Sequence, residues 1–149
     1  GSSGSSSSDA SSSRASRAAW SLAILASRCA CRFVHAACSF CQAWCAAFTG
    51  DCLERAGLPS TESGAARSYA SWGNGIAAPR VGCVVVLWRE FVKGPHGHVG
   101  FFEREDSKGI WILAGNQGNA VTVKPFPRRR LLALRWPTRS MLAAVSAPS

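Results

Sequence analysis

Cys45, His98 and Asn116 are the residues of this chain whose types and spacing suit nucleophilic chemistry. Cys45 lies at the start of an expected helix, where unpaired backbone N–H groups and the helix dipole favour a thiolate. The small residues Ala46 and Ala47 follow it and leave room for a substrate to approach the sulfur. A cysteine at such a position is more often a buried structural residue, so the case for a nucleophile depends on a nearby base.

His98 is the histidine best placed to act as that base, because it opens an expected strand. A hairpin that turns about Ser107 places His98 opposite Asn116. Opposed side chains on antiparallel strands have Cβ atoms roughly 5 Å apart, so an amide there could fix the imidazole tautomer. The pattern therefore predicts a Cys-His-Asn set, which a slip of one residue in the register would break. The same register pairs Phe102 with Ile112 and Arg104 with Ile110.

The chain divides into four expected segments. Residues 1–19 are rich in Ser and lack apolar periodicity, so we expect a disordered tail or an added linker there. Residues 20–42 are rich in Ala and Cys, and their pattern defines no clear structure. Residues 43–137 are the expected folded domain, and residues 138–149 are an expected C-terminal tail.

Apolar spacing predicts helices first and strands after them. A helix is expected from Trp44 to Ala56, with Gly57 as its C-terminal cap. A second helix is expected over residues 63–72, closed by a turn at residues 73–75. Helices followed by antiparallel strands indicate the α+β class. The expected strands cover residues 81–88, 98–103, 110–115, 120–124 and 131–136.

Charge and hydropathy narrow the function only weakly. The net charge of +9 and the isoelectric point near 9.9 favour an acidic partner, such as nucleic acid, anionic lipid or a bacterial wall polymer. No apolar run approaches the roughly 20 residues that a membrane span needs. Residues 14–30 loosely resemble a short signal peptide, but Ser27-Arg28-Cys29 is a poor cleavage context.

Several motifs together resemble the NlpC-type and CHAP-type cell-wall hydrolases. They are Trp44-Cys45-Ala46-Ala47-Phe48, Ala56-Gly57-Leu58-Pro59, Gly97-His98-Val99-Gly100-Phe101 and Gly115-Asn116-Gln117. A final strand like Leu134-Arg135-Trp136-Pro137 is similar to that of a small phage and bacterial branch of this group. The resemblance covers residues 44–137, and both the order and the spacing of the motifs agree.

The resemblance implies a papain-like α+β fold, with N-terminal helices packed on a central antiparallel sheet. It implies cleavage of an amide bond in peptidoglycan, with Cys45 as nucleophile, His98 as base and Asn116 as the orienting residue. The implied substrate-binding residues are Trp44, Gly97 and Gln117. No metal or organic cofactor is expected, and the protein is expected to be a monomer.

Peptidoglycan is the partner that the resemblance implies, and an inhibitory or immunity protein is a further partner open to such an enzyme. The implied location is the cell wall, reached by secretion, in the periplasm or by phage delivery. Neither a nucleic-acid partner nor a membrane span is expected.

Three other functions stay open from the residues. A zinc site is one, since Cys38-x-x-Cys41 near His35 has ligand-like spacing, although no second well-spaced pair follows. Arg128-Arg129-Arg130 and the net charge favour a nucleic-acid binder, without a recognised binding motif. The third is a catalytically impaired wall-binding module of the same fold, because the cysteine-rich stretch and Ala43 stand where the family commonly has an ordered helical segment and a proline before the Trp-Cys pair. A second departure is Val81-Gly82-Cys83, where the family usually has Pro-Gly-Asp.

Overall fold

Residues 44–115, 117 and 120–146 are the part of the chain that the computed structural model describes. The expected boundaries within residues 1–42 therefore lie outside the described residues. In the described part, no helix is both long enough and apolar enough to cross a membrane.

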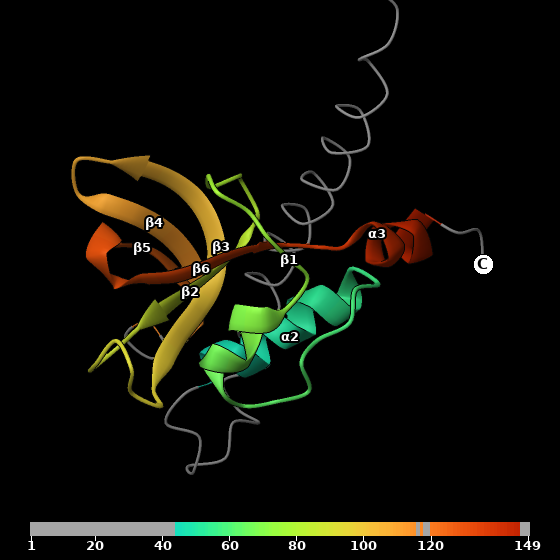
Figure 1. The fold of residues 1–149 in the computed structure, drawn as a ribbon, viewed down its shortest axis with the longest axis horizontal. Coiled ribbons are helices and arrows are strands. Elements are labelled where there is room, and N and C mark those ends of the chain that lie inside the picture. Colours follow the sequence, from blue (N-terminus) through green and yellow to red (C-terminus); the bar gives the residue numbers. More distant parts are fainter. Residues whose placement is uncertain (1–43, 116, 118–119, 147–149) are drawn as a thin grey trace, which may run out of the picture.

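The described chain is a curled sheet of six strands with helices on one side, which confirms the α+β class (Figure 1). The strand order is β1-β6-β2-β3-β4-β5, and neighbouring strands are antiparallel. β2 lies between β6 and β3 and is buried on both faces, as its continuous apolar run predicts. The strands are β1 (Asn74–Gly75), β2 (Val84–Trp88), β3 (Gly97–Asp106), β4 (Gly109–Ala114), β5 (Thr122–Phe126) and β6 (Leu131–Trp136).

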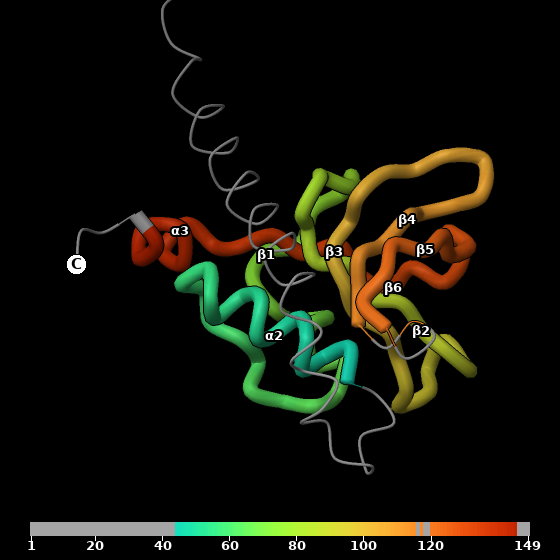
Figure 2. Tube along the Cα trace, turned by 180° about the vertical axis from the view of Figure 1, so that it is seen from behind, coloured from blue at the N-terminus to red at the C-terminus, as the bar shows by residue number. Residues whose placement is uncertain are grey.

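Alternation along the strands divides the core into two clusters, one on each face of the sheet. Val86 and Val99 pair on the face that packs against helix α2 (Cys45–Arg55). Leu87 belongs to the cluster on the opposite face, over which the sheet curls (Figure 2). His98 is the direct partner of Leu87, so its side chain faces the enclosed side of the sheet.

Helix α2 begins and ends where the sequence predicts. At its end, Gly57 takes a positive φ of 80°, and the Leu58 N–H donates to the Leu53 carbonyl at 2.9 Å. Within the helix, a Cβ at Gly50 would lie 3.0 Å from the hydroxyl oxygen of Tyr69. Glycine at this position therefore lets the segment that contains Tyr69 approach the helix closely.

Two other segments differ from the sequence expectation. The predicted helix over residues 63–72 is a shorter 3-10 helix, η1 (Ala66–Ser71). The predicted turn at residues 73–75 is partly wrong, because Asn74–Gly75 form edge strand β1. Arg135 of β6 bonds to the residues just before this strand, since its guanidinium donates to the Trp72 carbonyl at 2.6 Å and to the Gly73 carbonyl at 2.9 Å. The expected C-terminal tail contains helix α3 (Arg139–Ser146).

Candidate active site

Helix α2 and strand β3 meet at Val99, and this contact positions Cys45. Thr49 Oγ1 donates to the Val99 carbonyl at 3.5 Å, and the backbone N–H of Val99 bonds to the Cys45 sulfur. Cys45 and Thr49 are four residues apart, so they lie on one face of the helix. The β3–β4 pairs of the described chain extend only as far as Phe101 with Leu113. Helix α2 therefore bonds to Val99 beyond the end of that strand pairing.

The end of β4 approaches the start of α2 with no room for a side chain between them. A Cβ at Gly115 would lie 2.5 Å from Cζ3 of Trp44 and 2.8 Å from Cβ of Phe48. Trp44 is buried by this contact, with 8% of its surface exposed. Trp44 thus packs the helix onto the sheet, and its contact with substrate stays a prediction.

Arg67 of η1 holds the loop that leads into His98. Its guanidinium donates to three backbone carbonyls within residues 91–96, at 2.7, 2.8 and 2.9 Å. Gly97 packs directly on this arginine, because a Cβ there would lie 3.0 Å from Arg67 Cγ and 2.9 Å from the Leu87 carbonyl oxygen. Gly97 is therefore a packing position, and its contact with substrate also stays a prediction.

Gln117 is the side chain that orients the His98 imidazole. Oε1 of Gln117 lies 3.0 Å from Nε2 of His98. Nε2 of Gln117 donates to the Thr122 carbonyl at 2.7 Å and contacts Thr122 Oγ1 at 3.0 Å. Because a carbonyl only accepts, the amide nitrogen faces Thr122 and the amide oxygen faces the imidazole. His98 therefore carries its proton on Nε2, which leaves the Nδ1 lone pair free to accept one.

The predicted hairpin register is confirmed close to the site and wrong close to the turn. Phe102 pairs with Ile112, as expected. Arg104 pairs with Trp111 instead of Ile110, because the register shifts between Phe102 and Arg104. Such a β-bulge adds one residue to one strand and moves every later pair by one position.

Asn116, the predicted orienting residue, lies outside the described residues, so its pairing with His98 stays a prediction. Gln117, predicted to bind substrate, is the described amide in contact with His98, and it is 5% exposed. The signal that would have found it is its position directly after Asn116. A one-residue uncertainty in the register makes either amide a candidate.

Burial dominates the electrostatics of Cys45, which has no exposed surface. Burial raises the pKa of its thiol above the ordinary value of 9.0, while the Val99 and Ala46 N–H groups and the charge of Arg89 lower it. The resting group is therefore a neutral thiol that needs a base. Elsewhere, burial raises the pKa of Cys52 to about 12, so its thiol is a poor nucleophile.

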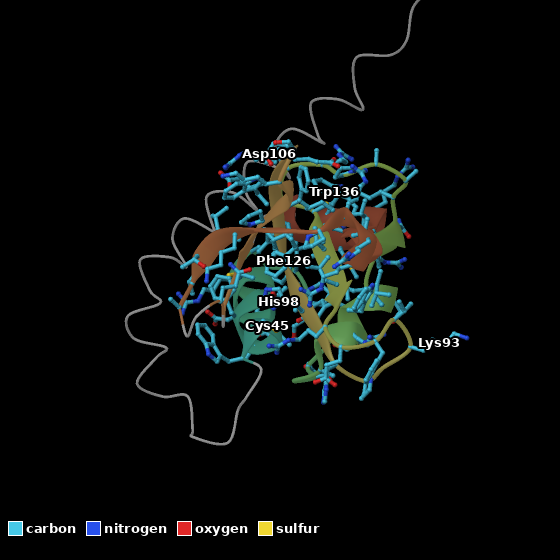
Figure 3. The ribbon with its side chains drawn as sticks, turned by 90° about the vertical axis from the view of Figure 1, so that its left-hand side faces the viewer. Cys45, Lys93, His98, Asp106, Phe126 and Trp136 are labelled. Atoms are coloured by element: carbon cyan, nitrogen blue, oxygen red, sulfur yellow. The ribbon has the colours of Figure 1, made fainter. Side chains whose placement is uncertain are left out.

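His98 is 5% exposed, and burial lowers the pKa of its imidazole below the ordinary value of 6.5. The hydrogen bond that His98 donates to Gln117 Oε1 raises this pKa, and the charges of Arg89 and Arg130 lower it further. Phe126 packs against the imidazole, with ring centroids 5.1 Å apart. In the view of Figure 3, His98 is labelled between Cys45 and Phe126. Sequence reasoning missed Phe126 because the expected strand stopped at residue 124.

The described residues contain no group of three or more His, Cys, Asp or Glu side chains that could hold a metal ion. The zinc alternative involves His35, Cys38 and Cys41, which lie outside the described residues. The three described cysteines are free thiols: Cys45, Cys52 and Cys83.

Comparison of the chain with protein-family models, curated proteins and solved structures gave no match. The chemistry of the site is therefore argued from its own geometry. Cys45 begins a helix beside a strand that carries His98, and a buried amide leaves Nδ1 of His98 unprotonated. A thiol and an oriented neutral imidazole are the groups that acyl transfer through a covalent thioester requires.

Proposed function

We propose that this chain is a papain-like cysteine hydrolase that cleaves an amide bond in peptidoglycan. The observation that carries the proposal is the hydrogen bond between His98 Nε2 and Gln117 Oε1, at 3.0 Å within the core. A buried amide whose nitrogen is already bound to Thr122 leaves the imidazole one tautomer, and that tautomer is a base at Nδ1.

In the proposed reaction, Nδ1 of His98 takes the proton from the Cys45 thiol, and the sulfur attacks the carbonyl carbon of the amide. The N–H group of Cys45, at the start of helix α2, helps to stabilise the oxyanion that forms. The imidazolium then gives its proton to the leaving amine, and a thioester remains on Cys45. Water, deprotonated by His98, hydrolyses the thioester and restores the thiol.

The substrate follows from the motif resemblance and from the charge. Cys45, His98 and the amide-bearing segment at residues 115–117 occur in the order of the NlpC-type and CHAP-type hydrolases. The net charge of +9 suits an anionic wall polymer. The bond cleaved is a muramoyl–alanine amide or an amide of the stem peptide, and the protein would act at the wall after secretion, in the periplasm or after phage delivery.

The test is clearance of a purified peptidoglycan suspension, together with mass spectrometry of the released fragments. Wild type is expected to clear the suspension, and Cys45→Ala is expected to abolish clearance while thermal unfolding stays cooperative. Cys52→Ala is the matched control, because it removes a buried thiol from the same helix, away from His98. Equal clearance by wild type and Cys45→Ala would show that Cys45 is not the nucleophile.

The complete burial of Cys45 favours one second candidate, a catalytically impaired wall-binding module of the same fold. A sulfur without exposed surface meets a substrate only when the groups that cover it move. Such a module would sediment with peptidoglycan but would release no new amines. Amine release by wild type, and its loss in Cys45→Ala, would eliminate this candidate.

A further inference from the structure

The loop between β2 and β3 places two apolar side chains next to each other in solvent. Phe91 is 65% exposed and Val92 is 56% exposed, the highest values among the large apolar residues of the described chain. Single exposed apolar side chains are common on protein surfaces and need no explanation. A neighbouring pair, each more than half exposed, is instead a surface that an apolar partner could cover.

Hydrogen bonds to its backbone hold this loop in one conformation. The Phe91 carbonyl accepts the Gly94 N–H at 3.1 Å, which closes a turn of four residues. Val92 and Lys93 form the apex of the turn. From η1, the guanidinium of Arg67 donates to the carbonyls of Phe91 and Val92 at 2.7 and 2.8 Å. The tip is therefore ordered before it meets a partner, so less conformational entropy is lost on binding.

Lys93 gives the tip a positive charge that points out from the molecule. Its side chain is exposed and extends beyond the loop, away from Cys45 and His98 (Figure 3). The acidic residue of the loop, Glu90, precedes the turn, and its Oε1 lies 3.4 Å from Nδ1 of His96. The tip thus combines apolar side chains with a cation, in a chain whose net charge is +9.

The small size of the tip favours a lipid surface over a protein partner. A stable protein interface covers roughly 800 Å² on each partner and involves about 20–30 residues, far more than this tip supplies. A bilayer requires only that apolar groups enter the boundary between headgroups and acyl chains, and cations beside them add attraction for anionic lipids. We propose that the tip formed by Phe91, Val92 and Lys93 inserts into the surface of an anionic lipid bilayer. The inference goes beyond the proposed hydrolase and does not depend on it.

The test is flotation of the full chain with vesicles of phosphatidylcholine and phosphatidylglycerol in equal parts. Wild type is expected to float with these vesicles and much less with vesicles of phosphatidylcholine alone, because the anionic lipid attracts the basic chain. The double variant Phe91→Ser with Val92→Ser is expected to lower the partition coefficient about tenfold to a hundredfold, since the apolar burial is lost. Lys93→Gln, which removes one charge near the lipid surface, is expected to lower it about fivefold.

Val81→Ser is the matched control, because it makes the same kind of change at an exposed valine outside the tip. Val81 is 42% exposed and precedes β2, whereas the tip follows that strand. Its partition coefficient is expected to stay within about twofold of wild type, and surface substitutions of this kind should leave the fold intact. Thermal unfolding of each variant checks the fold.

Two outcomes would overturn insertion directly. They are a wild type that does not float with the mixed vesicles, and a double variant that floats as well as wild type. A wild type that stays with neither vesicle but sediments as a dimer, which the double variant cannot form, would assign the tip to a second copy of the chain and also overturn the proposal.

The test separates bilayer binding from hydrolysis. Cys45→Ala is expected to float like wild type, and the double variant is expected to clear a lipid-free peptidoglycan suspension like wild type. A failure to float would leave the hydrolase standing. A wild type that floats but clears no peptidoglycan would overturn the hydrolase and support the bilayer site.

Discussion

At one end of strand β3, residues 97–99 lie against helix α2, the 3-10 helix η1 and the segment that follows β4. At the other end, the exposed residues 104–106 pair with β4, which in turn pairs with β5. The backbone of Val99 bonds to side chains of α2, and His98 bonds to Gln117. At the hairpin end, Asp106 pairs with Gly109 and its carboxylate accepts the Lys108 N–H at 2.8 Å.

The two ends of β3 differ in the partners that their polar groups bond to. At the hairpin end most of them bond to near neighbours or face solvent, apart from the ion pair between Glu105 and Arg128. At the His98 end the partners come from segments that are distant in sequence and buried together. Exclusion of water by several elements at once favours the neutral forms of the buried His98 imidazole and the buried Cys45 thiol.

Gly115→Ala is the change expected to have the largest effect, because it disrupts the His98 end directly. The new Cβ would meet Trp44 and Phe48, so β4 and the start of α2 must separate. Overpacking of this kind costs about 1–3 kcal/mol in the free energy of unfolding and should displace Cys45, which abolishes clearance of peptidoglycan. Chemical denaturation and the clearance assay measure the two effects.

Gly64→Ala is the matched control for that variant, because a Cβ at Gly64 would meet nothing within 4 Å. Its activity should equal that of wild type, and its stability should be unchanged or slightly higher. If Gly115→Ala behaves like Gly64→Ala, the close approach of β4 to α2 does not position the site.

Gln117→Leu is expected to have the next largest effect, since it removes the acceptor that fixes the His98 tautomer. The free Nε2–H loses its partner and the imidazole can adopt the wrong tautomer, so kcat/KM should fall about 100-fold or more. Thr122→Val is the control, because it removes Oγ1 but keeps the carbonyl that holds the amide nitrogen at 2.7 Å. Nitrogen-15 spectra of the imidazole should report the tautomer in each variant, and a wild-type kcat/KM for Gln117→Leu would exclude an orienting role.

The same comparison explains how much the sequence predicts. β6 is found at residues 131–136, as expected, and α2 begins at Cys45 with Gly57 beyond its end, because caps and alternation are local signals. The predicted hairpin turn is likewise confirmed, with Asp106 paired to Gly109. The papain-like assignment and the peptidoglycan substrate rest on motif resemblance and remain proposals.

The His98 end was predicted only in part, for a physical reason. Motif order predicts the pairing of Cys45 with His98, which stays a prediction. The bonds from α2 to Val99 depend on where the β3–β4 pairing stops. The bulge after Phe102 is not encoded in the alternation of apolar residues, so the register near the turn was wrong by one position. Phe126 and Arg130 approach His98 only because the sheet curls, and no local pattern specifies the extent of that curl.

The pH dependence of kcat/KM tests whether the buried imidazole of His98 is neutral. His98 must be unprotonated to accept the thiol proton, and burial with the nearby arginines lowers the pKa of its imidazole. The acidic limb of the profile should therefore have its midpoint below pH 6.5, with activity retained as the pH falls through that value. Circular dichroism across the same range separates this limb from acid unfolding, because the unfolded state binds the proton more tightly and stability also falls below pH 6.5. A midpoint above 6.5 would contradict a desolvated imidazole.

Arg104→Gln should have the smallest effect on stability and activity. It tests whether the hairpin end of β3 is independent of the candidate site. The Arg104 guanidinium lies 3.9 Å from the Trp111 ring centroid and pairs with Glu103 on an exposed surface. Exposed contacts of this kind stabilise a protein by about 0.5–1 kcal/mol at most, so the melting temperature should fall only slightly. Clearance of peptidoglycan and the tautomer of His98 should stay as in wild type, because the contacts that fix the imidazole come from the other end of β3. A large loss of activity in this variant would mean that the two ends of the strand are coupled, and the contrast between them would then fail.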